Sequence, residues 1–236
     1  MERLTATLSV SAGVALNFCG VNIWIDALHN QKVNNFSTLS PGQVEELFQN
    51  AAFQKPDVIF FTHCHPDHFS EALARRAKEM WSDATLILPE RRFDDQILLM
   101  GEEMSLDVKG LHLTFKKLIH EEEQYAAVPH YGLLLEGGGR RFLFPADCAL
   151  ESKLLADFLQ HTPLDAAFLD FPWVALPRGR RFIESEINAE HLVFYHLPLA
   201  DEDTYHYRPV SRRAAQWLED RYNTHFMEDF LQTITL

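Results

Sequence analysis

The 236-residue sequence has few cysteines, few basic residues and no long apolar run. Its three cysteines are odd in number and show no zinc-knuckle spacing, which argues against a disulfide framework and fits a reducing cytoplasm. No segment approaches the roughly 20 consecutive apolar residues of a membrane-spanning helix, and the N-terminus lacks the apolar core of a signal peptide. We therefore expect a cytoplasmic protein without a membrane partner.

Basic residues are in the minority, with 21 Lys and Arg against 34 Asp and Glu, so the formal net charge is -13. An acidic surface repels phosphate backbones, and we expect no long nucleic acid as a partner. Bound divalent cations would create a local exception within such a protein. A Gly-x-Ser-x-Gly motif is also missing, so the sequence does not show this signature of a serine nucleophile.

The order of the expected elements indicates an α/β fold, with residues 1–236 forming a single domain. Alternating apolar residues predict antiparallel strands early in the chain, and Ser40 followed by Pro41 marks a helix start. In chain order, the predicted segments are strands in 4–26, helix 40–53, strand 56–65, helix 70–81, strand 84–89, strands in 105–147 with a turn at 136–141, helix 149–162, strands 164–172 and 190–198, and helix 209–226. This order of elements is compatible with two mixed sheets that have helices on their outer faces.

Four metal-binding side chains lie at the end of the buried strand 56–65 and directly after it, in the stretch "THCHPDHFS". Alternate residues of an extended chain face the same way, so His63 and His65 point together. Pro66 then breaks the strand, and Asp67 and His68 precede a helix. One metal ion can take His63 and His65, and a second ion can take Asp67 and His68. Imidazole and carboxylate suit Zn²⁺, with Mn²⁺ or Fe²⁺ as alternatives.

This H-x-H-x-D-H stretch resembles the signature of the metallo-β-lactamase superfamily, whose fold is a four-layer αββα sandwich of two mixed sheets. The resemblance implies a bridging aspartate, which we assign to Asp147 in "FLFPAD", with Ala146 where glycine is usual. It implies a last histidine, which we assign to His196 after the strand "LVFY". It also implies that Asp26 accepts a hydrogen bond from a ligand histidine and so fixes its orientation.

The third histidine implied by the resemblance has two candidates in this sequence. His120 ends one strand and lies twelve residues before Gly132, while His130 lies two residues before it. The longer gap is similar to that of the ascorbate phosphate lactonases in this superfamily. We favour His120 as the ligand and place His130 close by, as a substrate contact or in support of the ligands.

These residues imply a dinuclear metal-dependent hydrolase, in which a hydroxide bridging two ions attacks an ester, lactone or phosphoester bond. Asp67 and Asp147 are its expected catalytic carboxylates. The sequence lacks the H-x-E-x-D pattern of the di-iron flavoproteins, so we do not expect a redox role. Two alternatives stay open: a phosphodiesterase acting on cyclic nucleotides or nucleic acid, and a non-catalytic metal-binding module.

Substrate recognition is only weakly marked in the sequence. Arg178 and Arg181, in a stretch expected to connect two strands, suit a small anionic molecule, because guanidinium groups bind carboxylate and phosphate in a bidentate manner. A solvated basic loop would contain the same residues. His206, in the polar segment after His196, is a further candidate for contact with substrate. Homo-oligomer formation is left open.

Overall fold

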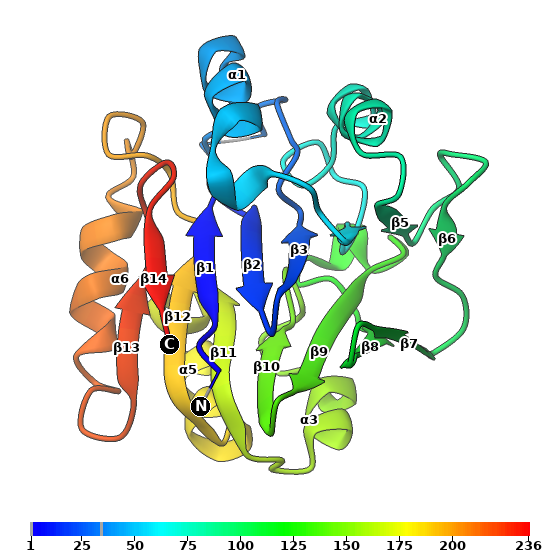
Figure 1. Cartoon of the computed structure of the whole chain (residues 1–236). Helices are drawn as coiled ribbons and strands as arrows, with labels where there is room; N and C mark the ends of the chain where they lie inside the picture. Colours follow the sequence, from blue (N-terminus) through cyan, green and yellow to red (C-terminus); the bar gives the residue numbers. More distant parts are fainter. Residues whose placement is uncertain (1, 34) are drawn as a thin grey trace.

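The computed structural model describes residues 2–33 and 35–236, which form two seven-stranded β-sheets with helices on their outer faces (Figure 1). The first sheet has the order β14 (Thr233–Thr235), β1 (Thr5–Leu8), β2 (Val14–Phe18), β3 (Val21–Ile25), β4 (Val58–Phe60), β5 (Thr85–Leu88), β6 (Ile97–Leu98). The second has the order β13 (Asn223–Phe226), β12 (Ala189–Tyr195), β11 (Leu164–Asp170), β10 (Arg140–Phe144), β9 (Tyr131–Gly137), β8 (Leu111–Lys117), β7 (Glu103–Val108).

Both sheets combine an antiparallel half with a parallel half. Strands β14 to β3 pair antiparallel and β3 to β6 parallel, while β7 to β10 pair antiparallel and β10 to β13 parallel. Carboxyl ends of neighbouring parallel strands lie at one edge of a sheet, which is where α/β proteins commonly place a site. The prediction of two mixed sheets is confirmed.

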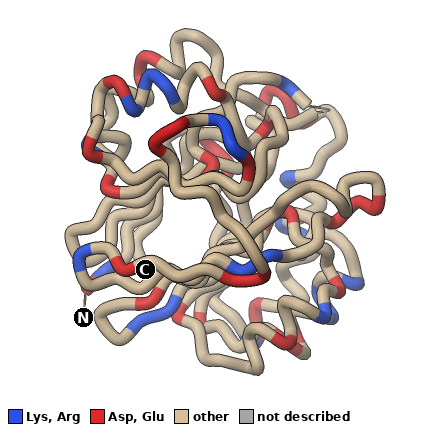
Figure 2. The backbone as a smooth tube through the Cα atoms, turned by 90° about the vertical axis from the view of Figure 1, so that its right-hand side faces the viewer, with Lys and Arg blue, Asp and Glu red and all other residues tan. Residues whose placement is uncertain are grey.

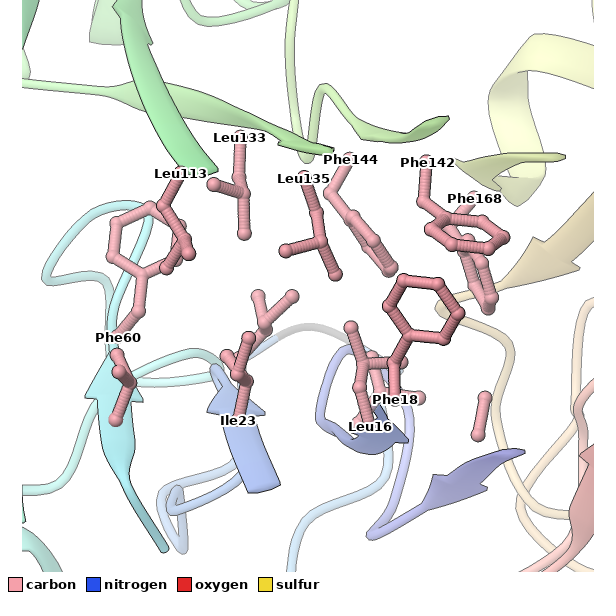
Figure 3. Packing of buried hydrophobic residues seen from close by; sticks show 14 of the residues in the cluster. Leu16, Phe18, Ile23, Phe60, Leu113, Leu133, Leu135, Phe142, Phe144 and Phe168 are labelled. Carbon is pink, nitrogen blue, oxygen red and sulfur yellow. The ribbon is translucent and has the colours of Figure 1, made fainter. Parts of the chain in front are cut away.

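The two sheets pack face to face through an apolar core (Figure 3). In that view Phe18, Ile23 and Phe60 of the first sheet point toward residues of the second sheet, among them Leu135 and Phe144. Alternation along each strand sends every second side chain into this layer, and such burial contributes about 1.5–3 kcal/mol for each large apolar side chain. The strand that precedes His120 alternates in this way, because Leu111, Leu113 and Phe115 are buried in this layer.

Two further apolar clusters hold the helices against the outer faces of the sheets. Helices α1 (Pro41–Gln49) and α2 (Glu71–Met80) pack on the first sheet. The second sheet is covered by α3 (Lys153–Leu159), α4 (Phe171–Ala175), α5 (Pro177–Glu186) and α6 (Tyr207–Ala215). The layers are therefore helix, sheet, sheet and helix, as the sequence predicted. None of the helices in the described part of the chain has the length and apolar character needed to span a bilayer.

The helix starts follow their sequence signals closely. Ser40 caps α1 by accepting a hydrogen bond from the Gln43 backbone N–H at 3.3 Å, and the Gln43 side chain accepts one in return from the Ser40 backbone N–H at 3.0 Å. This reciprocal capping box satisfies two of the donors that a helix start leaves free. The predicted start at Pro41 is therefore confirmed.

The structure corrects two of the predicted elements. Residues 177–186, expected as a loop between strands, form α5, and the segment before it forms α4. Proline lies at the first or second position of each helix, where its missing N–H costs nothing. The predicted closing helix over 209–226 ends at Ala215, and Asn223–Phe226 is instead the edge strand β13, paired with β12.

Candidate metal centre

Seven side chains converge where the parallel strands of the two sheets end. His63, His65, Asp67 and His68 follow β4, His120 follows β8, Asp147 follows β10 and His196 follows β12. The Tyr131 backbone N–H, at the start of β9, donates to the Thr62 carbonyl oxygen at 2.9 Å and joins the two sheets beside this point. All seven are residues that the sequence predicted as metal ligands, and the structure brings them together.

The ligand atoms of these side chains form three overlapping groups, and within each group all atoms lie within 4.8 Å of one another. The groups are His63, His65 and His120; His63, His68 and Asp147; and Asp67, His68 and His196. His63 belongs to the first two groups and His68 to the last two, so the three groups form one connected cluster of donors. The arrangement has the donor number and the nitrogen and oxygen chemistry of a site for two divalent ions.

Several donor atoms in this cluster are buried without a hydrogen-bond partner, namely His63 Nε2, His120 Nε2 and Asp147 Oδ1. An unsatisfied buried polar group costs about 1–3 kcal/mol, and a charged one costs more. Each of these atoms faces the same small region, so a divalent cation would satisfy them together. The residues present therefore fit the metal ions that the donor set implies.

Asp26 organises two of the imidazoles from behind. Its Oδ2 accepts hydrogen bonds from His68 Nδ1 at 2.9 Å and from Thr62 Oγ1 at 2.6 Å, and its Oδ1 accepts one from the Thr62 N–H at 2.8 Å. Because the Thr62 hydroxyl donates to Asp26, it can accept from His63 Nδ1, which lies 3.0 Å away. Both imidazoles then carry their proton on Nδ1 and present the lone pair of Nε2 to the cluster. This geometry supports the expected role of Asp26.

The Nε2 atoms of His68 and His196 lie only 3.0 Å apart. With the proton of His68 held on Nδ1, its Nε2 lone pair points at His196, whose own Nδ1 lies 3.3 Å from the Ser11 hydroxyl. At this distance one of the two nitrogens donates a proton to the other, or a cation takes the place of that proton. The pair can therefore contribute to a cation site when both Nε2 atoms are deprotonated.

The pKa values of the cluster follow from burial and from its mutual charges. Burial lowers the pKa of His63 well below its usual value and also lowers that of His196, which keeps both imidazoles neutral. Burial opposes protonation of His68 as well, but Asp147 and Asp26 outweigh it and raise its pKa well above the ordinary range. Burial likewise opposes ionisation of Asp147, yet His68 and His196 hold its pKa well below normal. Without metal, a second proton on Nε2 of His68 therefore pairs with Asp147, 3.3 Å away, and a bound cation would take the place of that proton.

Four residues around the cluster have left-handed backbone conformations, which non-glycine residues rarely adopt. They are Ser11, Asp26, Ala146 and His196, with φ values of 46°, 49°, 50° and 57°. Such positions cost about 1–3 kcal/mol each and persist where the surrounding structure imposes them. Ala146 occupies the position at which the resemblance leads us to expect glycine, and its positive φ gives the physical reason for that glycine.

The structure distinguishes the two candidates for the third histidine. His120 contributes a ligand atom to the group with His63 and His65. His130 is completely buried, its ring centroid lies 5.3 Å from that of His63 and 5.7 Å from that of His120, and neither ring nitrogen has a partner. His130 thus lies beside the ligand imidazoles, without joining any of the three groups.

The other three predicted substrate residues, Arg178, Arg181 and His206, belong to none of the three ligand groups. The Arg178 guanidinium forms an ion pair with Glu121, the residue after His120, and Arg181 forms one with Glu151 at 3.5 Å. Both arginines belong to α5, not to a loop. His206 is exposed at the residue before α6.

Four residues that the sequence analysis did not single out lie against the cluster. Thr62 has been described above. The Tyr125 ring packs against His65 and His120, and the Phe36 ring lies 4.3 Å from that of His196. Asp170 ends β11, between the strands that lead to Asp147 and His196, and its Oδ1 is buried without a partner. Burial and the nearby Asp147 raise its pKa well above the usual range. Only Asp170 had a sequence signal, since it follows a buried strand.

Comparison with known proteins places the chain in a family. The sequence profile described as the Beta-lactamase superfamily domain matches residues 22–221, and the chain therefore belongs to this superfamily. No curated protein sequence matches the chain. The expected resemblance is thus confirmed at the level of the superfamily.

Several solved structures share the fold at low identity. Igni18, a metallo hydrolase from Ignicoccus hospitalis, is 16% identical with a TM-score of 0.68, covering 99% of this chain and 98% of its own. An isothiocyanate hydrolase from Delia radicum gut bacteria is 18% identical with a TM-score of 0.64, covering 98% of each chain. CmlA, a diiron β-hydroxylase from Streptomyces venezuelae, is 15% identical with a TM-score of 0.67; this chain is covered completely but spans only 54% of CmlA.

Proposed function

Because the chain belongs to the beta-lactamase superfamily, we propose that it is a hydrolase that uses two divalent metal ions. The observation that carries this proposal is the set of three overlapping donor groups, in which His63 and His68 are each shared. A site for a single ion needs about four ligands, whereas seven donor side chains meet here. The buried atoms without partners add to this support, because a folded protein seldom leaves several such atoms together.

The two ions would be held by different halves of the cluster. His63, His65 and His120 would hold one, Asp67, His68 and His196 the other, and Asp147 would lie between them. When bound, two such ions lower the pKa of a coordinated water and polarise the substrate oxygen, which permits hydrolysis near neutral pH. We propose zinc as the metal, and manganese and iron suit the same donors.

The chain's own residues position this chemistry. Asp26 and Thr62 orient the imidazoles of His68 and His63, and Ser11 contacts His196. The five most buried ligands exclude water from the back of the cluster, so that the open side is the side of His65 and Asp147. Asp147 is the more exposed of the two ligand carboxylates, since its side chain is 18% exposed whereas Asp67 is buried.

An ester or lactone, or else a phosphoester, is the bond class that suits this site. The long segment between His120 and Gly132 supports the lactonase-like branch of the superfamily within this class. The expectation of an anionic substrate has weaker support, because Arg178 and Arg181 are each paired with a glutamate. We propose a small molecule as the substrate.

The experiment that tests this function is metal reconstitution of Asp67→Ala beside the wild type, followed by assays of lactones, esters, thioesters and phosphodiesters. We expect the wild type to hydrolyse at least one class in a metal-dependent manner, and Asp67→Ala to lose at least about 100-fold in rate. An undiminished rate in the folded variant contradicts the proposal. Metal binding by the wild type without any hydrolysis would favour a non-catalytic metal-binding module, and hydrolysis of cyclic nucleotides alone would favour the phosphodiesterase.

A further inference from the structure

Two of the seven members of the cluster are partly exposed, and the other five are buried. Asp67 is 5% exposed, and four of the histidines are 5% exposed or less. His65 and Asp147 are the two members that are partly exposed. A substrate therefore reaches the cluster past these two residues, and the side chains next to them decide what can enter.

An aromatic side chain stands at this opening. The Tyr125 ring centroid lies 4.6 Å from that of His65 and 5.2 Å from that of His120, in T-shaped contacts, and its side chain is partly exposed. Its backbone donates to the Glu122 carbonyl at 2.8 Å and accepts from the Val128 N–H at 2.8 Å. The ring therefore packs on two of the ligand imidazoles, beside the partly exposed His65, and part of its own surface is accessible.

The charged residues just before Tyr125 in the chain are all acidic. A hollow of about 620 Å³ is lined by Glu121, Glu122, Glu123, Gln124 and Arg178. The one cation of this lining, Arg178, is paired with Glu121, while Glu122 and Glu123 are exposed. Figure 2 shows acidic residues distributed widely over the outer loops and helices of the molecule. Glu122 and Glu123 precede Tyr125 in the chain and form none of the ion pairs of the described residues, so they repel a negative charge on a group that lies on this ring.

We propose that the site takes substrates in which the group next to the scissile bond is flat, apolar and uncharged, and that Tyr125 determines this preference. Aromatic groups pack on one another in offset or edge-to-face geometry and gain energy beyond their buried area. A carboxylate on the same group would face Glu122 and Glu123. This inference rests on the proposed metal-dependent function and specifies its substrate class.

Binding of phosphonates to the metal-loaded protein tests the inference without requiring turnover. Methylphosphonate, phenylphosphonate and 4-carboxyphenylphosphonate share one metal-binding head and differ only in the group that would lie on Tyr125. Isothermal titration calorimetry of the wild type should give phenylphosphonate about 10-fold tighter binding than methylphosphonate. The 4-carboxy compound should bind about 5-fold more weakly than phenylphosphonate, and added salt should reduce that difference.

Matched variants separate the ring from its hydroxyl and from the rim charges. Tyr125→Leu should bring the ratio of phenyl to methyl affinity to near 1, while Tyr125→Phe should keep it. Trp217→Leu, at a residue that is 78% exposed and distant from the cluster in the chain, serves as a surface control and should change nothing. In Glu122→Gln/Glu123→Gln the penalty on the 4-carboxy compound should disappear. Metal content, measured on each variant, should match the wild type.

Equal binding of phenylphosphonate and methylphosphonate by the wild type would overturn the inference, as would tighter binding of the 4-carboxy compound. A loss of the ratio in Tyr125→Phe would also overturn it, because the hydroxyl and not the ring would then be recognised. Failure of the proposed function looks different, since protein that retains no metal after reconstitution would bind none of the three compounds.

Discussion

His120 and His130 lie at the two ends of one loop, and both imidazoles reach the neighbourhood of His63. Only His120 contributes a ligand atom to the group with His63 and His65, whereas His130 is enclosed behind them. Burial lowers the pKa of His120 to about 4 and that of His130 to about 3, so both are neutral near pH 7. We therefore expect His120 to be a metal ligand and His130 to pack against the ligands.

Substitution of each histidine tests this difference. His120→Ala should weaken binding of the metal shared with His63 and His65 by about 10-fold or more, because one of its ligands is lost. His130→Ala should retain normal metal content per folded chain and lose thermal stability instead, since it empties a fully buried position. Equilibrium dialysis with metal analysis, combined with a circular dichroism melt, measures both effects. Metal lost with His130→Ala and kept with His120→Ala would reverse the assignment.

Much of the candidate site could be predicted because its residues are close in sequence. His63, His65, Asp67 and His68 occupy six positions at a strand end, where alternation and one proline fix their directions. His120 could not be separated from His130 in this way, because both lie outside the regular strands and the fold of the segment between them sets their positions. Thr62, Tyr125 and Phe36 belong to residue types that are common throughout the chain, and only the fold brings them to the cluster.

Helices α4 and α5 show how strongly the packing of two elements can depend on one residue. A Cβ placed on Gly179, in α5, would lie 2.5 Å from the Trp173 carbonyl oxygen and 2.7 Å from its Cα. A Cβ atom does not approach a non-bonded heavy atom this closely, and the backbone of α4 cannot move aside cheaply. Gly179 is therefore required for the close approach of the two helices over the second sheet.

We expect Gly179→Ala to lower the free energy of unfolding by about 1–3 kcal/mol, because the helices must separate. Gly42, in the exposed first turn of α1, is the matched control, since a Cβ there would meet nothing within 4 Å. Gly42→Ala should raise the stability by up to about 1 kcal/mol, as alanine is the better helix former. Urea titrations of both variants measure these changes. Equal effects of the two substitutions would show that the α4–α5 contact is not restrictive.

The same helices illustrate why part of the fold was not predictable. Pro172, Pro177 and Gly179 read as loop residues in the sequence, yet the prolines lie at helix starts and the glycine lies at a helix contact. The closing helix was predicted too long because the sequence shows no clear stop after Ala215. Residues 223–226 become a strand through pairing with β12, a contact between distant segments that local propensity does not register.

Buried neutral histidines make the stability of the metal-free molecule depend on pH. Burial lowers the pKa of His29 and of His130 to about 3 each, against about 6.5 in the unfolded chain. Below pH 6.5 the unfolded state therefore binds protons that the folded state does not, and stability falls as the pH falls. His68 acts in the opposite direction, because its raised pKa contributes stability below pH 6.5 that is lost at higher pH.

Each of the two strongly shifted histidines should cost about 2 kcal/mol of stability between pH 7.5 and pH 5. Together they exceed the opposing effect of His68, so chelator-treated protein should be clearly less stable at pH 5. Urea denaturation at both pH values measures the loss, and in His130→Phe, which cannot be protonated at this position, the loss should be smaller by about 2 kcal/mol. An undiminished loss in that variant would show that His130 does not contribute to it.

The two-ion centre is tested most directly by elemental analysis of the whole protein, purified without chelator and again after reconstitution with zinc, manganese or iron. The seven convergent donors lead us to expect about two metal ions per chain, held tightly enough to survive gel filtration. A reconstituted stoichiometry near zero in folded protein would contradict the centre altogether. A stoichiometry that stays near one metal ion per chain, and that survives replacement of Asp67 and His196, would contradict the second of the two ion sites.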